Sequence, residues 1–266
     1  MKSQSFTGNI PDTRFPVLLL FTVLFLLHMV SCNKDPVEYS PVPRSLEVWL
    51  HRVNTIEKAQ HFQDLYSGFE LDVHFDTNAG TFIVKHDFTD TTTLTLSTWL
   101  GAIADPGKLG YWLDFKNLTE EIRIPALTEL TRIRSAFGLT GNLIIVESSC
   151  PSCLPPFDTL NFRISYYIPT FDPSAITPGE ELEYRDYIEG FVSQNDIGTI
   201  SGYYYQHGFM QKWFPGMNKL LWYLDSTDPA VKDSIVAETK KDPSVEVLLV
   251  TENYKQSDPD PRLREK

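Results

Sequence analysis

The strongest constraint on the fold is a regular alternation of strand-length apolar runs with segments of helical spacing. The sequence contains eight such runs, each rich in β-branched and aromatic residues. They cover residues 46–53, 68–76, 110–117, 142–149, 162–168, 197–205, 220–225 and 245–251. Because a closed parallel barrel requires eight strands, this count favours a barrel.

Helical spacing or capping residues occur between most of these runs, at residues 55–67, 96–104, 122–137, 178–195 and 229–240. In the first of these segments, Thr55 is suited to cap the start of a helix and Gly68 to end it. Strand and helix alternation favours parallel strands with right-handed crossovers, in a barrel or in an open doubly wound sheet. With eight strands, we predict an α/β fold of the TIM (β/α)8 barrel type, as a single domain over residues 46–254.

A ninth short run, residues 81–86, follows the turn sequence Asn78-Ala79-Gly80. This order predicts that the run folds back on the second strand as a β-hairpin. It would then be an addition to the barrel strands rather than one of the eight.

The N-terminal region has the plan of an export signal. An apolar stretch at residues 15–30 is preceded by basic residues and ends just before Cys32. The sequence Met29-Val30-Ser31-Cys32 resembles a bacterial lipobox. We therefore expect a lipoprotein signal peptide over residues 1–31 and lipidation of Cys32, with an uncleaved anchor helix as the alternative.

The residues that flank the predicted barrel are polar or rich in proline. Residues 32–45 have no apolar period and are expected to form a tether, and residues 255–266 a polar tail. These segments predict an exported lipoprotein that is anchored to the membrane of a bacterial envelope, on its periplasmic or cell-surface side. The formal net charge of −12 makes nucleic acid a poor partner, because a phosphate backbone would meet a repulsive field.

Two cysteines remain beyond the export segment, Cys150 and Cys153, within a short proline-rich loop. An exported compartment permits a disulfide, whereas a structural zinc site would need more ligands. We expect a disulfide that fastens this loop, and a redox role is the weaker alternative.

The second strand carries polar residues at every other position: Glu70, Asp72, His74 and Asp76. Because side chains alternate along a strand, these four point to one side. A buried parallel strand is normally apolar on both faces, and neighbouring carboxylates repel each other there. A cationic group is therefore expected among them, although an antiparallel strand with one solvated face would show the same alternation.

The third strand repeats this pattern with Asp114 and Lys116 among aromatic residues. Carboxylate oxygens from Glu70, Asp72 and Asp114 suit a hard cation, Mg²⁺ or Ca²⁺, better than zinc. We therefore predict one divalent cation at these three residues.

Two histidines end neighbouring elements: His51 the first strand and His86 the hairpin strand. The carboxyl ends of strands are where barrel enzymes place their sites. Two imidazoles beside a cation are equipped for paired general acid and base catalysis. The motifs of serine hydrolases, zincins and phosphate-binding loops are absent from the sequence.

These residues together resemble the superfamily of phospholipase-C-like phosphodiesterases, which includes glycerophosphodiester phosphodiesterases, spider-venom phospholipases D and the menorins. The resemblance lies in the order and spacing of motifs in about the first third of the predicted mature chain. The motifs are His51-Arg52-Val53-Asn54-Thr55, Phe69-Glu70-Leu71-Asp72-Val73 with Phe75-Asp76, Lys85-His86-Asp87 and Leu113-Asp114-Phe115-Lys116.

The resemblance implies a barrel with a metal held at Glu70, Asp72 and Asp114 and with His51 and His86 as acid and base. It implies in addition that Lys116 contacts the phosphate. In that chemistry a substrate hydroxyl attacks phosphorus, and the cyclic phosphate that forms is or is not opened by water. The division of acid and base between the two histidines stays open at this point.

Three further residues are assigned to substrate. Arg52 would pair with phosphate or form an outer salt bridge. Asn54 would orient a ligand, bind substrate or cap the first helix. Trp222 would flank a headgroup or pack in the core.

Two positions depart from the superfamily pattern. Asp114 stands where glycerophosphodiesterases have glutamate, which shortens the reach of this ligand. His74 is unexpected, and we interpret it as an added ligand or as a residue held by Asp76.

The sequence therefore predicts a membrane-tethered, metal-dependent phosphodiesterase that acts on a glycerophosphodiester or phospholipid headgroup. The alternative is a non-catalytic surface barrel that binds glycan or lipid headgroups, suggested by those departures and by the aromatic residues at 203–214. These aromatic residues have a plainer interpretation as core. A metal hydrolase of the amidohydrolase type ranks last, because the first strand lacks its His-x-His motif.

Overall fold

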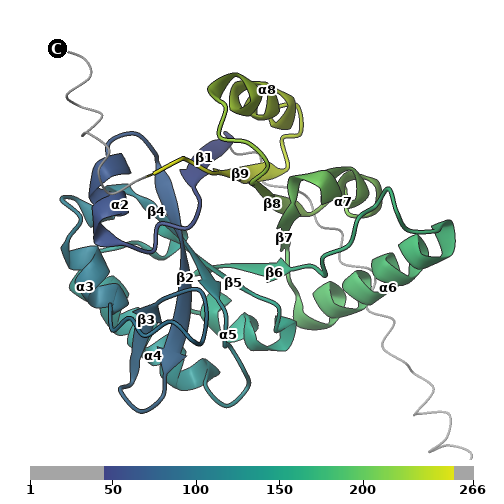
Figure 1. Ribbon diagram of the computed structural model, residues 1–266. Coiled ribbons are helices and arrows are strands. Elements are labelled where there is room, and N and C mark those ends of the chain that lie inside the picture. Colours follow the sequence, from purple (N-terminus) through teal and green to yellow (C-terminus); the bar gives the residue numbers. More distant parts are fainter. Residues whose placement is uncertain (1–44, 255–266) are drawn as a thin grey trace, which may run out of the picture. The chain divides into compact units, whose positions relative to one another are not determined.

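The computed structural model describes residues 45–254, which form a closed barrel of eight parallel strands (Figure 1). The strands are β1 (Glu47–Leu50), β2 (Gly68–Asp76), β4 (Gly110–Phe115), β5 (Ile144–Ser148), β6 (Arg163–Tyr167), β7 (Thr199–Tyr203), β8 (Asn218–Tyr223) and β9 (Val245–Val250). The barrel closes where β1 pairs with both β2 and β9. The predicted TIM barrel is confirmed.

Strand β3 (Thr81–Val84) pairs antiparallel with β2, from Asp76 opposite Thr81 to Val73 opposite Val84. Gly80 completes the turn with a φ of 65°, a conformation that favours glycine. The predicted hairpin is confirmed, and it extends the sheet beyond β2 without entering the barrel.

The helices lie outside the barrel strands (Figure 1). They are α2 (Ile56–Phe62), α3 (Leu96–Gly101), α4 (Arg123–Ala136), α5 (Pro155–Asp158), α6 (Pro178–Asn195), α7 (His207–Trp213) and α8 (Pro229–Thr239). Short 3₁₀ turns occur at η1 (Pro106–Lys108), η2 (Gly141–Leu143), η3 (Pro151–Cys153) and η4 (Tyr204–Gln206). The sequence did not predict α5 and α7, which are too short to show a clear helical period.

Thr55 caps α2 as predicted, because its hydroxyl accepts a hydrogen bond from Lys58 N at 3.2 Å. The prediction that Gly68 ends this helix is wrong. The helix ends at Phe62, and Gly68 is the first residue of β2. A Cβ at Gly68 would lie 2.4 Å from the Trp49 ring, so this glycine permits close packing across the barrel rather than a helix cap.

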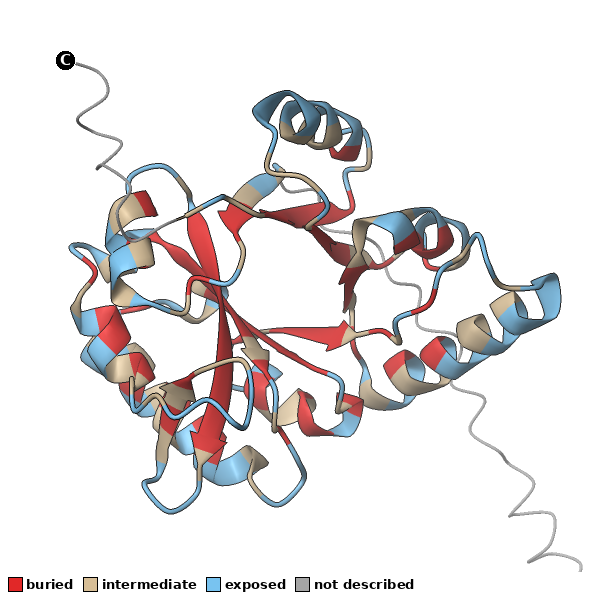
Figure 2. Cartoon of the chain, viewed as in Figure 1, coloured by how far each residue is buried: buried red, intermediate tan, exposed pale blue. Residues whose placement is uncertain are grey.

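Two apolar clusters fill the fold. The larger one packs the outer faces of the strands against the helices. The smaller one fills the barrel interior with Trp49, Trp112, Ile145, Leu220, Trp222, Val247 and Leu249. Most strand residues are therefore buried on both faces (Figure 2).

Several sequence-based expectations fall outside residues 45–254. These are the signal peptide over residues 1–31, the lipidated Cys32, the tether up to residue 44 and the tail at 255–266. Among the residues that the structure describes, no helix has both the length and the apolar character needed to cross a bilayer.

Candidate functional site

Three carboxyl groups meet inside the barrel. Glu70 and Asp72 lie on β2 and are 2% and 1% exposed, and Asp114 is paired with Asp72 in the register between β2 and β4. One oxygen from each of the three residues lies within 4.8 Å of the others. The predicted convergence of these side chains is confirmed.

Hydrogen bonds from the segment after β1 fix two of these carboxylates. Arg52 N donates to Glu70 Oε2 at 2.5 Å. The Asn54 amide donates to Asp72 Oδ2 at 2.6 Å and accepts from Asp72 N at 3.0 Å. Of the three roles considered for Asn54, the geometry favours orientation of a carboxylate, since Thr55 is the helix cap.

Two cations accompany the cluster. Lys116 Nζ lies 2.9 Å from Asp72 Oδ1 and forms a second ion pair with Asp114. Arg52 Nε lies 3.6 Å from Asp72 Oδ2, while half of the Arg52 side chain remains in solvent. Both cations line the same cavity as the carboxylates.

The electrostatic balance differs among the three carboxyl groups. Burial, together with the charges of Asp72 and Asp114, raises the pKa of Glu70 well above its ordinary value. Burial likewise raises the pKa of Asp114, although Lys116 opposes it. Burial also acts to raise the pKa of Asp72, but the Lys116 ammonium and the Asn54 amide outweigh burial and lower it. Burial and mutual repulsion therefore disfavour the charged forms of Glu70 and Asp114.

A divalent cation fits this donor set. Three carboxylate oxygens in one small space are the ligands that Mg²⁺ and Ca²⁺ prefer, and their mutual repulsion is relieved by a double positive charge. The structure describes one other group of this kind, Glu120 with Cys150 and Cys153, but the two cysteines are bonded to each other. The carboxylate cluster is therefore the candidate metal site of the described chain.

His51 lies at the end of β1, beside this cluster. Its Nε2 is 3.7 Å from Glu70 Oε2, and its Nδ1 is 3.5 Å from the Thr251 hydroxyl. Burial, together with the positive charge of Arg52, lowers the pKa of His51 to about 3. Its imidazole is therefore neutral near pH 7 and able to accept a proton.

The turn after His51 is strained and is held by a partly buried cation, Lys58. Arg52 has a φ of 53°, in the left-handed region that non-glycine residues rarely adopt. Lys58 Nζ, from α2, donates to the carbonyls of His51 at 2.9 Å and Arg52 at 3.0 Å. Lys58 was not predicted from the sequence, because only the fold shows that α2 returns this lysine to the turn.

His86 follows β3 and lines the same cavity as His51. Its Nδ1 lies 2.8 Å from Asp87 Oδ1, and 38% of its side chain is exposed. The histidine of the hairpin thus joins the first histidine at one site, as predicted.

Neither interpretation of His74 is correct. Its Nε2 contacts the main-chain oxygen of His86 at 3.1 Å, and it is not among the cluster of potential ligands. Asp76 does not hold it, because His74 Nδ1 has no hydrogen-bond partner among the described residues. Asp76 Oδ1 instead accepts hydrogen bonds from Asn78 N and Ala79 N in the hairpin turn. The sequence pattern placed His74 on the inner face but did not reveal its partner.

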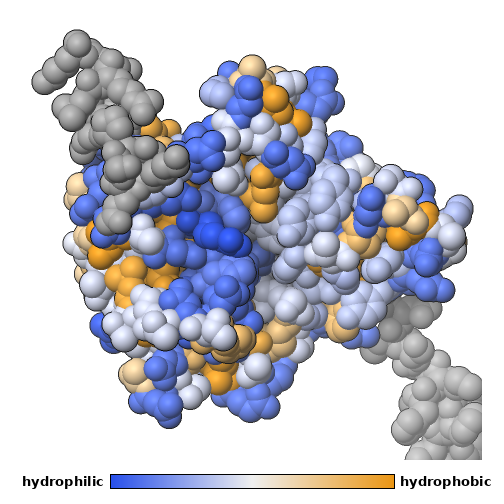
Figure 3. Space-filling model, in the orientation of Figure 1, coloured by the Kyte–Doolittle hydropathy of each residue, from blue (hydrophilic) through white to orange (hydrophobic). Residues whose placement is uncertain are grey.

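The charged residues line one side of a cavity of about 100 Å³. Aromatic residues line the rest, with the Trp222 ring edge-on to Tyr167 at 4.6 Å and to Tyr203 at 5.2 Å. Of these, Tyr167 was not predicted from the sequence. Strongly hydrophilic residues gather beside the hollow at the centre of the face seen in Figure 3.

The aromatic residues at 203–214 divide between the core and the cavity. Phe209 and Phe214 are buried in the outer core, as the plainer interpretation expected, whereas Tyr203 lines the cavity. A larger surface cavity of about 470 Å³ lies along α6, but it contains none of the predicted site residues.

Glu147 is a further buried carboxyl, paired with Asp114 in the register of β4 and β5. It is 0% exposed and is not among the residues that line the cavity. Burial, together with the Asp114 charge, raises its pKa well above the ordinary value. It is not among the ligands predicted from the sequence.

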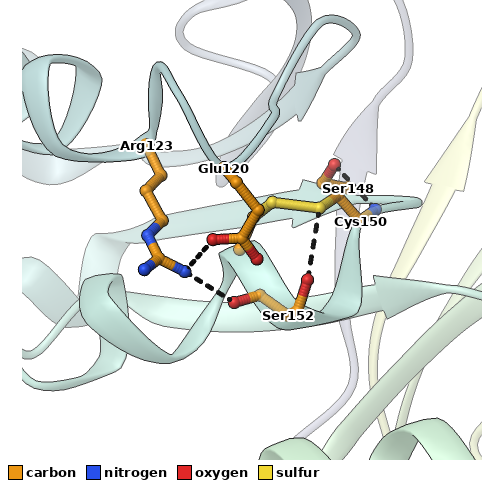
Figure 4. Close-up of a disulfide and its surroundings, with 6 residues drawn as sticks. Glu120, Arg123, Ser148, Cys150 and Ser152 are labelled. Carbon is orange, nitrogen blue, oxygen red and sulfur yellow. Dashed lines mark hydrogen bonds and ion pairs between the residues drawn. A yellow bond between two sulfur atoms is a disulfide. The ribbon is translucent and has the colours of Figure 1, made fainter.

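The loop after β5 is closed by a disulfide between Cys150 and Cys153, as predicted (Figure 4). Glu120 lies beside the sulfur atoms and pairs with Arg123, which in turn donates to Ser152 O at 3.4 Å. The disulfide thus belongs to a fastened loop outside the cavity.

No family model matches the sequence, and no curated protein matches it. Solved structures do match. A glycerophosphodiester phosphodiesterase from Parabacteroides distasonis is 15% identical, with a TM-score of 0.54 over 79% of this chain and 94% of that one. This chain shares its barrel fold. The fold-level resemblance that the motifs implied is thereby confirmed.

Two other solved structures match the same barrel fold. A candidate glycerophosphoryl diester phosphodiesterase from Silicibacter pomeroyi is 13% identical, with a TM-score of 0.54 over 79% of this chain and 91% of that one. A candidate glycerophosphodiester phosphodiesterase from Galdieria sulphuraria is also 13% identical, with a TM-score of 0.53 and coverages of 79% and 94%. At such identities, the matches show the fold alone.

Proposed function

We propose that this protein is a metal-dependent phosphoric diester hydrolase or lyase that acts on a glycerophosphodiester or a phospholipid headgroup. The observation that carries the proposal is the meeting of two histidines, three carboxylates and one lysine at a single cavity. The barrel shared with proteins named as glycerophosphodiester phosphodiesterases supports it.

Glu70, Asp72 and Asp114 would hold one Mg²⁺ or Ca²⁺ ion. When bound, such an ion supplies positive charge that stabilises the phosphate oxygens as phosphorus is attacked. Lys116 and Arg52 add fixed positive charge beside the same carboxylates, which favours a phosphate over a neutral ligand.

The two histidines divide the proton transfers. His51 is the base, because its lowered pKa keeps the imidazole neutral and its Nε2 lies at the carboxylate cluster. It takes the proton of a substrate hydroxyl while the hydroxyl oxygen forms a new bond to phosphorus. The bond from phosphorus to the leaving oxygen breaks, and His86, aligned by Asp87, protonates that oxygen.

The product of this step is a cyclic phosphate, which water can open if the same histidines exchange roles. The wall formed by Tyr167, Tyr203 and Trp222 would contact the organic part of the headgroup. The sequence further supports lipid attachment at Cys32 and a position on the surface of a bacterial envelope membrane.

One observation favours the alternative of a non-catalytic barrel that binds glycan or lipid headgroups. Lys116 pairs with both Asp72 and Asp114, so two of the three carboxylates have a cation without any metal. In that case the aromatic wall would supply the binding energy, and a chelator would leave binding unchanged.

The test is a turnover assay of the full-length protein with glycerophosphocholine, lysophosphatidylcholine and sphingomyelin, with chelator, Mg²⁺ or Ca²⁺. We expect cation-dependent release of phosphate products, and a loss of 10²-fold or more, on the order expected for a general acid or base, in His51→Ala and His86→Ala. His61→Ala is the matched control, because His61 packs against Phe62 and Tyr254 outside the cavity. Headgroup binding without turnover, unaffected by chelator, would select the non-catalytic alternative.

A further inference from the structure

His74 is a buried polar residue in the middle of a barrel strand. It follows Glu70 and Asp72 along β2 and is 3% exposed. Its Nδ1 is buried without a hydrogen-bond partner among the described residues. Burial of an unpaired ring nitrogen is unfavourable, and an apolar side chain would avoid this cost. The other ring nitrogen must therefore explain why an imidazole stands here.

That nitrogen, Nε2, lies 3.1 Å from the main-chain oxygen of His86. A carbonyl oxygen can only accept a hydrogen bond, so Nε2 carries the proton and donates. The bond crosses from the inner face of β2 to the residue proposed as the acid.

His86 needs such a contact, because the chain leaves the sheet immediately before it. Strand β3 ends at Val84, and Lys85 N makes the next bond to β2 by donating to Asp72 O at 2.9 Å. Beyond Lys85, the segment 86–93 contains no helix or strand. The His74 bond therefore ties His86 to the strand that carries two of the proposed metal ligands.

Apolar packing is a weaker candidate for holding this segment. Phe88 approaches the His74 ring edge-on, with ring centroids 4.5 Å apart. However, Phe88 is 73% exposed, so its contact removes little apolar surface from water. The hydrogen bond, which is directional and partly shielded from water, is the stronger restraint on His86.

We infer that His74 is a positioning residue that sets the place of His86 by donating to its main-chain carbonyl. The inference rests on the proposed function, in which His86 protonates the leaving oxygen. Strand β2 carries Glu70 and Asp72, and through this bond it would also fix the position of His86. The acid and these carboxylates would then be held at distances suited to one phosphate. A displacement of about 1 Å in such a group is enough to cost on the order of a hundredfold in rate.

Two substitutions separate the hydrogen bond from the packing. His74→Gln keeps a donor near the position of Nε2 and removes the ring, whereas His74→Phe keeps the ring against Phe88 and removes the donor. We expect His74→Phe to lower kcat about tenfold or more, with KM and the affinity for Mg²⁺ or Ca²⁺ unchanged within about twofold. His74→Gln should retain at least about half of kcat. If His74→Phe kept its kcat and His74→Gln lost it, the result would show a packing role for the ring and overturn the inference.

Hydrogen exchange of the segment 85–93, followed by mass spectrometry, gives a readout that needs no activity. His74→Phe should increase its exchange rate several-fold, about the effect of losing one hydrogen bond, while His74→Gln stays near the wild type. Unchanged exchange in His74→Phe would overturn the inference, even if the wild type cleaves diesters. A wild type without turnover would end the proposed function, and the exchange result would still decide whether His74 holds this segment.

Discussion

Carboxyl groups at the bottom of the cavity are costly to bury so close together, and Glu70 bears most of that cost. Lys116 pairs with the other two carboxylates. Within residues 45–254, Glu70 accepts a hydrogen bond from Arg52 N, and His51 Nε2 lies 3.7 Å away. Its pKa is raised by burial and by its acidic neighbours. Such a perturbed carboxyl on the lining of a cavity is typical of a functional site.

Glu70→Gln should therefore separate stability from cation binding. Without a divalent ion, we expect the free energy of unfolding to rise by about 1 kcal/mol or stay unchanged, because the amide removes a repulsive buried charge. Affinity for Mg²⁺ or Ca²⁺ should fall about 100-fold, because a charged ligand is lost. Urea unfolding with chelator and titration calorimetry measure the two effects.

Glu147→Gln is the matched control for this prediction, since Glu147 is equally buried but lies outside the cavity lining. It should leave cation affinity unchanged. Equal losses of affinity in the two variants would contradict the assignment of Glu70 as a ligand.

The lowered pKa of Lys58 makes the free energy of unfolding depend on pH in a direction that can be predicted. Burial lowers its pKa to about 8, against an ordinary value near 10.5. Between these values the unfolded chain binds a proton that the folded chain has released, so the free energy of unfolding rises with pH in this window. Below pH 8 both states are protonated, and the full cost of burying the ammonium is present.

Between pH 7.5 and 9.5, we expect the free energy of unfolding of the wild type to rise by about 2 kcal/mol relative to that of Lys58→Met. Urea unfolding at both pH values measures this difference. Lys240→Met, at an exposed position, should behave like the wild type. Parallel pH profiles for the wild type and Lys58→Met would show that the lysine is not desolvated at the His51 turn.

At the scale of elements, close contacts between strands set the shape of the barrel floor. Trp49 on β1 lies across Gly68 of β2 and Gly110 of β4, and a Cβ on Gly110 would come within 2.1 Å of its ring. Each glycine is the first residue of its strand, and because it has no side chain, the Trp49 ring fits in the barrel interior. The site residues stand further along the same strands, so this packing supports them from below.

Gly110→Ala should destabilise the protein by about 1–3 kcal/mol, the usual cost of overpacking. Gly190→Ala is the control, because Gly190 lies inside α6 and a Cβ added there would meet no heavy atom within 4 Å. It should stabilise the protein by about 0.5–1 kcal/mol through helix propensity. Thermal melting of the two variants should therefore shift in opposite directions, and shifts of the same sign would contradict this account of the floor.

At the scale of the whole molecule, local patterns in the sequence predicted the barrel, the hairpin and the set of residues that meets in the cavity. Period-two alternation placed Glu70 and Asp72 on one face, and strand ends placed His51 and His86 at one mouth. Roles that depend on contacts between distant segments could not be predicted. The main-chain partner of His74 and the contact of Gly68 with Trp49 exist only once the strands are assembled.

The central claim is that three carboxylates hold a cation at a site that cleaves phosphodiesters. The most direct measurement is turnover of a phosphodiester by chelator-treated full-length protein during titration with Mg²⁺ or Ca²⁺. We predict that turnover begins with the added ion, saturates at one ion per chain and is lost in Asp114→Asn. Turnover that persists in chelator, or an Asp114→Asn protein that responds to the ion like the wild type, would contradict the claim.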